Sequence, residues 1–343
     1  MALEADGQSG IGRVAAWRSA AGRDAPGLVT AAAATLAAAF LADHYGAPLT
    51  LMALLVGLAM NFLGADARLA PGLAFASRTL LRIGIVLVGL RITTGQIADL
   101  GIPAFIAIAA TVAITILSGV LAARWLGFSP AFGALAGGAV GICGASAALA
   151  FATLLGEKRA GQAQLTLVLV GISAMSAFAM FAYPIIAHAL GLGDRAAGYM
   201  LGASIHDVAQ ALGAGYSFSQ EAGATAAVVK LTRVALLAPA LACVALFLPR
   251  EPGARRIQGG IPWFVIAFFV VAAINSTGIV PERVSAGGAD VAAALLACAV
   301  AATGIRSPMQ ELLRTGPRPL LVIAAATLVA LLLSVAAARY LIG

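Results

Sequence analysis

Charged side chains are scarce in this chain. Only 10% of its 343 residues are Asp, Glu, Lys or Arg, whereas 62% are hydrophobic. So few charges cannot cover the surface of a soluble protein of this size, which excludes a water-soluble globular fold. The apolar residues instead form continuous runs of about 20, the length of a helix that crosses the ~30 Å hydrocarbon core of a bilayer. The sequence therefore predicts an integral membrane protein.

Cysteine and the motifs of common enzyme chemistry are also scarce. Cys143, Cys243 and Cys298 lie in apolar segments and lack the CxxC or His-paired spacing of a metal site. We expect three free thiols, no metal and no cofactor. The chain has no Walker A motif, so ATP-driven transport by this chain alone is not expected.

The apolar segments predict an all-α polytopic membrane protein with about 10–11 transmembrane helices. Residues 1–25 are predicted to form a cytoplasmic N-terminal tail, and residues 26–343 a single transmembrane domain. Two short segments punctuated by glycine, 47–63 and 197–216, either span the membrane or re-enter it. The predicted spans are 26–43, 47–63, 72–91, 102–126, 129–155, 161–190, 197–216, 222–248, 261–280, 285–305 and 318–341.

The chain contains an internal duplication. Gly89-Leu90-Arg91 recurs 215 residues later as Gly304-Ile305-Arg306, and Asn61 is matched by Asn275. This interpretation rests on Asn, Gly and Arg, because alanine and leucine identities arise by chance in apolar segments. The repeat-like parts, about 47–127 and 261–343, flank a central part at 129–248. Repeated apolar units are typical of transporters.

Basic residues predict the orientation in the membrane. Three basic stretches fall on one side of an eleven-span arrangement, which the positive-inside rule makes cytoplasmic. Arg91 then lies outside and Arg306 inside, so the duplicated halves are inverted. The loop of Glu157, Lys158 and Arg159 falls on the outer side, which indicates that one central segment re-enters or is miscounted. The three stretches contain Arg13, Arg18 and Arg23; Arg250, Arg255 and Arg256; and Arg306, Arg314 and Arg318.

Glycine interrupts the span at 129–155. The segment 137–147 holds four glycines and Ser146 in an otherwise apolar run. Each glycine costs about 1 kcal/mol in a helix interior and bares the backbone. A helix broken here would direct free N–H groups, and the positive end of its dipole, into the protein at mid-membrane depth, which predicts an anion site. The alternative is that the glycines only permit close helix packing.

A second interruption carries ionisable groups. The segment 202–210 repeats the Gly-Ala-Ser triplet and adds His206, Asp207 and Gln210. Helical spacing places Ser204 with Asp207, and His206 with Gln210, on adjacent polar stripes. Ionisable residues at membrane depth are costly and indicate function. The alternative is a structural His–Asp hydrogen bond within the bundle.

Lys230 and Arg233 form a third polar feature. They lie three residues apart on one face of a predicted span. Lys230 either extends to the membrane interface or is buried with Arg233, in which case Asp207 or a bound anion is the available negative partner. Asn61 and Asn275 are predicted to make hydrogen bonds between helices.

Together these motifs resemble the YeiH-like sulfate exporter family over nearly the whole chain after the tail. That family usually has Glu at the position of Asp207. The resemblance implies a carrier of sulfate or sulfonate-derived anions in the bacterial cytoplasmic membrane. It also implies a relation to the cation/proton antiporter and anion transporter group, with inverted repeats and two discontinuous helices crossing near the membrane centre. The matching motifs are 141–147, 204–210, 230–234, Asn275-Ser276 and 316–321.

We therefore expect a multi-pass secondary transporter that exports a small anion and is not an enzyme. Its expected partners are the anion, the lipid bilayer and a proton or counter-ion, with a homodimer as a further possibility and no nucleic acid. His206 and Asp207 are predicted to carry a coupling proton. Supporting roles are expected for Cys143, Gln210, Asn61 and Asn275. The predicted substrate-binding residues are Gly144, Ala145, Ser146, Gly202, Ser204, Lys230 and Arg233.

Two other classes of function stay open. A cation/proton antiporter would bind its ion at Asp207, although such sites usually benefit from more than one acid. An intramembrane enzyme would depend on Cys143 and His206, the only candidate dyad in the core.

Overall fold

The protein is helical throughout the part of the chain that the computed structural model describes, residues 2–45, 49–156, 158–247, 262–307 and 317–342. Seven helices in these ranges are long and apolar enough to cross a membrane, and shorter apolar helices lie between them. The prediction of an all-α polytopic membrane protein is confirmed.

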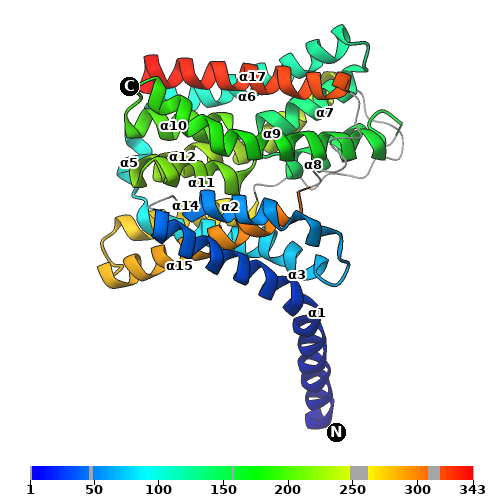
Figure 1. Ribbon diagram of the computed structural model, residues 1–343, viewed down its shortest axis with the longest axis vertical. Coiled ribbons are helices and arrows are strands. Elements are labelled where there is room, and N and C mark those ends of the chain that lie inside the picture. The colour runs from blue at the N-terminus through cyan, green and yellow to red at the C-terminus, as the bar shows by residue number, and fades with distance from the viewer. Residues whose placement is uncertain (1, 46–48, 157, 248–261, 308–316, 343) are drawn as a thin grey trace.

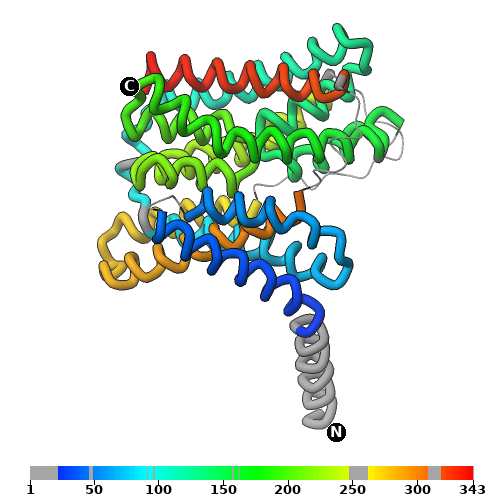
Figure 2. The backbone as a smooth tube through the Cα atoms, in the orientation of Figure 1, coloured from blue at the N-terminus to red at the C-terminus, as the bar shows by residue number. Residues whose placement is uncertain are grey.

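The helices form two layers (Figures 1 and 2). The first, here the scaffold layer, contains α1 (Ala2–Tyr45), α2 (Leu49–Ala59), η1 (Asn61–Ala65), α3 (Ala70–Phe75), η2 (Ala76–Leu80), α4 (Leu81–Val88), η3 (Gly89–Arg91), α14 (Trp263–Ser276) and α15 (Glu282–Ile305). The second, here the hairpin layer, contains α6 (Gly101–Trp125), α7 (Pro130–Gly141), α8 (Ala145–Leu155), α9 (Gln162–Ala189), α10 (Asp194–Ser204), α11 (Val208–Phe218), α12 (Gln220–Ala235) and α17 (Pro317–Ala337). Helix α5 (Thr94–Asp99) links the layers, α13 (Leu237–Phe247) follows α12, and η4 (Ala338–Ile342) follows α17.

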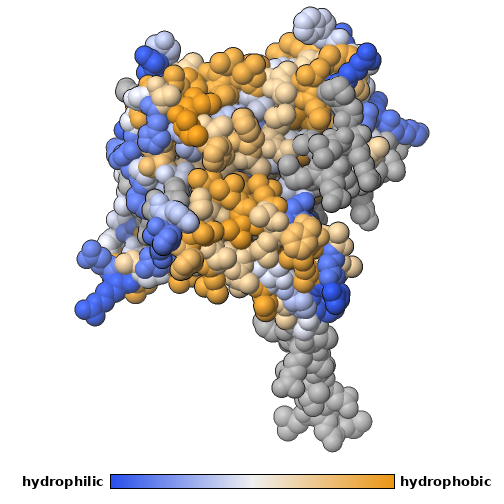
Figure 3. All heavy atoms as spheres, viewed as in Figure 1, coloured by the Kyte–Doolittle hydropathy of each residue, from blue (hydrophilic) through white to orange (hydrophobic). Residues whose placement is uncertain are grey.

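An apolar band crosses the face of the molecule seen in Figure 3, between two more hydrophilic ends. Figure 3 shows this band across both layers, with hydrophilic residues gathered at the left and right of the view. Large side chains such as Leu36, Phe40 and Ile102 are exposed on it. In water this exposure would be unfavourable, but lipid tails solvate it. The helices of both layers run between the two hydrophilic ends, so the membrane normal runs from left to right in Figure 1.

The matching halves of the duplication contact each other reciprocally. Asn61 Nδ2 donates to the carbonyl oxygens of Ile305 at 2.9 Å and Ser307 at 2.5 Å. Asn275 Nδ2 donates to Ile92 O at 3.3 Å, and Ile92 lies 215 residues before Ser307, the offset of the repeat. Each asparagine therefore holds the chain just after the Gly-x-Arg motif of the other half.

Corresponding helices of the two halves run in opposite directions. A Cβ added to Gly84 of α4 would meet Leu295 of α15, and one added to Gly288 of α15 would meet Leu90. Residue numbers rise along one helix as they fall along the other, so α4 and α15 are antiparallel. This is the geometry of an inverted repeat.

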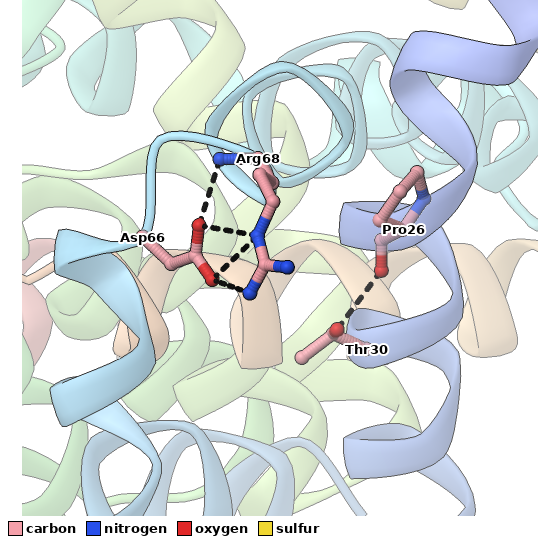
Figure 4. A network of polar contacts seen from close by, with 4 residues as sticks. All are labelled: Pro26, Thr30, Asp66 and Arg68. Atoms are coloured by element: carbon pink, nitrogen blue, oxygen red, sulfur yellow. Dashed lines mark hydrogen bonds and ion pairs between the residues drawn. The ribbon is translucent and has the colours of Figure 1, made fainter.

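A small polar cluster marks one end of the scaffold layer (Figure 4). Arg68 donates to Asp66 at 2.8 Å in the turn between η1 and α3, and this hydrogen bond lowers the pKa of the Asp66 carboxyl. On the neighbouring α1, the Thr30 hydroxyl donates to the Pro26 carbonyl at 2.9 Å. These groups lie at the hydrophilic end of the layer, where solvent screens the ion pair and limits its contribution to stability.

Candidate functional site

The segment predicted to be one interrupted span at 129–155 is a helical hairpin. A Cβ on Gly138 of α7 would lie 2.5 Å from the ring of Phe151 in α8. In a continuous helix these positions would be about 19 Å apart along the axis, at 1.5 Å per residue. Helices α7 and α8 therefore fold back on each other around residues 142–144, and we call this pair hairpin 1. The helix is interrupted where the sequence predicted it, but the prediction that 129–155 spans the membrane was wrong.

The segment 197–216 also re-enters, which was one of the two predicted outcomes. Gly198 and Gly202 of α10 face Ala222 and Ala226 of α12, in the same order, so α10 and α12 are parallel. Helix α11 is joined to α12 through Ser219 and packs back on it, with Gly215 against Gly223. Helices α10 and α11 consequently run in opposite directions and form hairpin 2, with its tip at residues 205–207.

The two hairpins enter from opposite faces of the membrane. Helix α9, 28 residues long, crosses between them. Figure 1 shows α7 and α8 towards the right face and α10 and α11 towards the left. Because hairpin 1 returns to the face it entered, Lys158 and Arg159 lie on the same face as Gly127. This removes the conflict that the eleven-span arrangement had with the positive-inside rule.

Glycine serves two different purposes in hairpin 1. Gly137 packs against α6, where a Cβ would come within 2.8 Å of Ile116 O, and Gly138 packs against Phe151. Gly144 is different: its φ is +67°, a region that L-residues rarely adopt, and it turns the chain into α8. A Cβ at Gly144 would lie 3.7 Å from His206 O, so the tips of the two hairpins touch here. Gly137 and Gly138 therefore permit close helix packing, which was the predicted alternative, whereas Gly144 forms the turn that interrupts the helix.

Lys230 of α12 lies between the two tips and holds their carbonyl groups. Its Nζ donates to Ile142 O at 2.8 Å, Ile205 O at 2.7 Å and His206 O at 2.5 Å. The three contacts match the three N–H donors of an ammonium group. The side chain is completely buried, which excludes the predicted alternative of extension to the membrane interface.

Arg233, one turn further along α12, also donates to carbonyl groups near the two tips. Its guanidinium donates to Val140 O at 2.9 Å, to Gly141 O at 2.6 and 2.9 Å, and to Gly202 O at 3.1 Å. The last carbonyl groups of a helix have no partners within it and carry partial negative charge. Lys230 and Arg233 thus neutralise the C-terminal ends of α7 and α10, and within the described residues neither forms an ion pair with a carboxylate.

Gly202 and Ser204 do not supply the backbone donors that were predicted for them. They lie in the last turn of α10, where carbonyl groups are the free groups, and Gly202 O accepts from Arg233. The Ser204 hydroxyl donates to Met200 O at 2.6 Å. The Gly-Ala-Ser triplet is repeated in sequence but not in position, because in hairpin 1 it begins α8 and in hairpin 2 it ends α10.

Asp207 caps the N-terminus of α11. Its Oδ1 accepts from the Gln210 backbone N–H at 3.1 Å, and its own N–H donates to Ser176 Oγ of α9 at 3.0 Å. A carboxylate at this end interacts favourably with the helix dipole. Asp207 is partly exposed, whereas Gln210 is 2% exposed and its Oε1 has no hydrogen-bond partner.

The N-terminus of α8 carries no comparable cap. Gly144 occupies the capping position and has no side chain to accept from the first turn. Ala145 and Ser146 are exposed, in contrast to the buried residues around them. The N–H groups of a first helical turn need partners from outside the helix. The site therefore has one helix N-terminus capped by the carboxylate of Asp207 and another without an acidic cap, where the Cys143 sulfur contacts the Ala147 N–H.

His206 is bonded to α17 instead of to Asp207. Its Nε2 lies 3.0 Å from Thr327 Oγ1, and that hydroxyl also lies 2.8 Å from Ile323 O. Which of the two atoms donates in the His206–Thr327 bond depends on the tautomer of the ring. Among the described residues, no hydrogen bond joins His206 to Asp207, so the alternative of a structural His–Asp bond does not hold. All three cysteines are free thiols: Cys143 is buried, Cys298 is partly buried and Cys243 is exposed.

Ser176 and Thr327 also contribute to the site and were not predicted from the sequence. Each is a hydroxyl residue in a long apolar helix, where such residues usually bond back to a carbonyl of the preceding turn, so their sequence signal is weak. Both contact hairpin 2: Ser176 accepts from the tip, and the Thr327 hydroxyl bonds to the His206 ring.

The two layers and the paired hairpins define a multi-pass membrane protein with a polar centre built from re-entrant helices. The chain belongs to the family described as conserved hypothetical protein 698, whose sequence model matches residues 26–323. This confirms the predicted family resemblance, since the curated relatives are UPF0324 membrane proteins.

Similar curated proteins cover most of the chain. UPF0324 membrane protein TauZ of Paracoccus denitrificans is 44% identical over 84% of this chain and 86% of its own. TauZ of Paracoccus pantotrophus is 42% identical over 88% and 91%, and a UPF0324 membrane protein of Chlorobaculum tepidum is 42% identical over 84% and 81%. No solved structure matches the chain.

Proposed function

We propose that the protein is a secondary transporter, an exporter of a small anion such as sulfate or a sulfonate-derived anion, in the bacterial cytoplasmic membrane. The observation that carries this proposal is an excess of positive charge at the hairpin tips. Lys230 and Arg233 are completely buried and Asp207 is the acid at the tips. The named side chains leave about one positive charge, because the partial charges of two helix N-termini and two C-termini, about 0.5 each, cancel.

The N-terminus of α8, which has no acidic cap, supplies the binding groups. Exposed Ala145 and Ser146 lie in its first turn, directly after the left-handed Gly144. Backbone N–H groups and the dipole of a helix N-terminus favour an oxyanion, and the Ser146 hydroxyl adds a donor. In this proposal Lys230 and Arg233 act on the anion through their charge, since their N–H groups are engaged by carbonyl oxygens.

Coupling to a proton rests on Asp207 more than on His206. His206 is completely buried beside two cations, so protonating it would add a third positive charge in a low-dielectric site. Asp207 is partly exposed, and its protonation would release the N-terminus of α11 for an anion. The inverted halves of the scaffold are consistent with a site that opens alternately to each face.

A cation/proton antiporter remains the second candidate. The partly exposed Asp207 at mid-membrane depth favours it, since an intramembrane acid is a natural ligand for a cation or proton. The adjacent Lys230 and Arg233 oppose it, because they repel a second cation. An enzyme is a third and weaker candidate, since His206 Nε2 contacts Thr327 and not Cys143.

Flux into proteoliposomes tests the proposal. Purified protein is reconstituted and uptake of labelled sulfate, sulfite and small sulfonates is compared with uptake of sodium, with a proton-sensitive dye inside. We expect anion flux at least tenfold above protein-free liposomes and no sodium flux. Sodium-dependent proton movement without anion flux would overturn the proposal in favour of the antiporter.

A further inference from the structure

A cavity of about 270 Å³ lies between the two layers, away from the hairpin tips. The scaffold layer contributes α2, α4 and α15, and the hairpin layer contributes the base of hairpin 2, where α11 ends and α12 begins. Its lining includes Thr50, Val88, Gln220, Ala289, Ala292 and Ala293. The cavity is therefore on the half of the membrane that hairpin 2 enters.

Polar groups and small side chains distinguish this cavity from a lipid-facing groove. Thr50 and Gln220 are polar residues of its wall, and the α15 side of the cavity is formed by the small residues Ala289, Ala292 and Ala293. By contrast, the groove of about 500 Å³ between α6, α7 and α13 is lined by apolar residues alone. Polar groups inside a membrane protein collect where water or a polar substrate passes.

Asp290 is an acidic residue of α15 beside the cavity. It lies on α15 eight residues after Glu282, about 12 Å into the helix at 1.5 Å per residue, and it is exposed. Its helical neighbours Ala289 and Ala293 line the cavity.

A close contact separates this cavity from the hairpin tips. Thr50 Oγ1 of the scaffold layer donates to Gly213 O of α11 at 3.0 Å. A Cβ at Gly213 would lie 2.6 Å from Met180 Cε, so α2, α9 and α11 meet here without free space. Gln210, with its unpartnered Oε1, lies one turn nearer the tip on the same face of α11.

The opposite side of the tips is open in the same conformation. Ala145, Ser146 and Leu149 form an exposed stripe along α8, and Leu149 is 49% exposed. The corresponding N-terminal turn of α11 is buried apart from Asp207. The structure therefore combines access along hairpin 1 with closure along hairpin 2.

We propose that the cavity is the vestibule of the transport path on the face that hairpin 2 enters, and that it holds the same small hydrophilic anion in transit. The contact of Thr50, Gly213 and Met180 is its gate, closed in this conformation. Movement of the layers that breaks the Thr50–Gly213 bond joins the cavity to the tips. This inference rests on the proposed function for the identity of the anion, but not for the presence of water.

Cysteine labelling tests the vestibule without measuring transport. Ala293→Cys places a thiol on the cavity wall, and Val291→Cys, on another face of the same helix and 51% exposed, is the matched control. Oriented vesicles are treated with 2-sulfonatoethyl methanethiosulfonate, which is membrane-impermeant and reacts with thiolates in water. The unsubstituted chain gives the background from Cys143, Cys243 and Cys298.

We expect Ala293→Cys to react at least tenfold faster than Val291→Cys from the face that hairpin 2 enters, and excess sulfate to slow the reaction. Equal rates for the two variants would overturn the vestibule, whatever the flux assay shows. Fast labelling that no anion slows would overturn the anion path through it while leaving a water-filled cavity.

The gate has its own test. Gln210→Cys lies behind the contact and is expected to react slowly from this face. Adding Thr50→Val removes the hydroxyl that bonds to Gly213 and keeps the side-chain shape, so the labelling rate should rise at least tenfold. An unchanged rate, with both variants monodisperse on size exclusion, would overturn the gate.

Discussion

Arg233 donates two hydrogen bonds to the carbonyl oxygen of Gly141, one from Nε at 2.9 Å and one from Nη2 at 2.6 Å. Gly141 is the last residue of α7, so this contact ends a half-helix in the interior of a membrane protein. A buried carbonyl without a partner is costly, and water is scarce at this depth. The cation of α12 makes a re-entrant hairpin possible here, and the N-terminus of α8 is left without an acidic cap.

Replacing Arg233 with Met should lower the stability of the protein. The change leaves the carbonyl groups of Val140, Gly141 and Gly202 without this donor, and each unsatisfied buried group costs about 1–3 kcal/mol. We expect a loss of at least ~3 kcal/mol, measured by denaturant unfolding in detergent. Arg124→Met, at the exposed end of α6, is the control and should change stability by less than about 0.5 kcal/mol. Equal effects would contradict the capping role.

Gly144→Ala should impair transport more than it impairs folding. At φ +67° and ψ −118° an L-residue carries strain of about 1–3 kcal/mol, and the turn that exposes the first N–H groups of α8 would shift. Gly191→Ala is the matched control, since Gly191 has φ +64° and open space around it in the turn after α9. Both variants should lose stability, and only Gly144→Ala should reduce flux, by at least tenfold. Gly144→Leu should abolish it. Normal flux in Gly144→Ala and Gly144→Leu would show that Gly144 is not needed for transport.

Asp207→Asn and Lys230→Met should have opposite effects on anion binding. An asparagine still caps α11 but removes the negative charge, so anion affinity should hold or rise and the pH dependence of flux between 5.5 and 8.5 should flatten. Lys230→Met removes a buried cation, so affinity should fall at least tenfold, about 1.4 kcal/mol. Affinity is measured by isothermal titration on monodisperse protein.

The cation/proton antiporter gives the reverse pattern. Asp207→Asn would then eliminate ion binding and Lys230→Met would mainly move the pH profile. Asp207→Glu is the control for charge, and it should keep the pH dependence that Asp207→Asn loses. Loss of all anion binding in Asp207→Asn with none in Lys230→Met would contradict our proposal.

The hairpins predict an unusual pattern of surface labelling. Cysteines at Gly127 and Lys158 should react with an impermeant reagent from the same face of the membrane, although 129–155 has the length of a span. Gly191→Cys, after α9, should react from the opposite face. Tags in the loops 91–101 and 306–316 should likewise appear on opposite faces, as the inverted repeat requires. Labelling of Gly127→Cys and Lys158→Cys from opposite faces would show that hairpin 1 crosses the membrane.

The sequence predicted where the helices break but not what the chain does afterwards. Gly144 and the His206–Asp207 pair stand out because glycine and ionisable residues are unfavourable in an apolar helix. Whether the next helix continues or returns depends on its packing. Phe151 fits against Gly138 and Gly215 against Gly223, and single-sequence periodicity carries no information about such pairs. The loop of Lys158 and Arg159 was the one sign of re-entry, through its conflict with the positive-inside rule.

The partners of Lys230 and Arg233 also depended on the fold. Two cations in an apolar span signal a buried polar site, and the available negative group in the sequence is Asp207. The structure gives them carbonyl oxygens instead, which are present at every residue and leave no trace in side-chain chemistry. Ile142 lies 88 residues from Lys230, and Gly141 lies 92 residues from Arg233.

The sequence alone determined that this protein lies in a membrane, that it is helical, that its halves are duplicated and that its polar centre lies near Gly144, Asp207 and Lys230. These follow from hydropathy, repeated motifs and the cost of polar groups in lipid, all of which act locally along the chain. Only the tertiary structure decided that two hairpins enter from opposite faces and that cations hold their C-terminal ends. It also showed that Asp207 caps one N-terminus and that the other has no acidic cap. The direction of a half-helix, and therefore the sign of the charge it presents, is set by distant packing contacts.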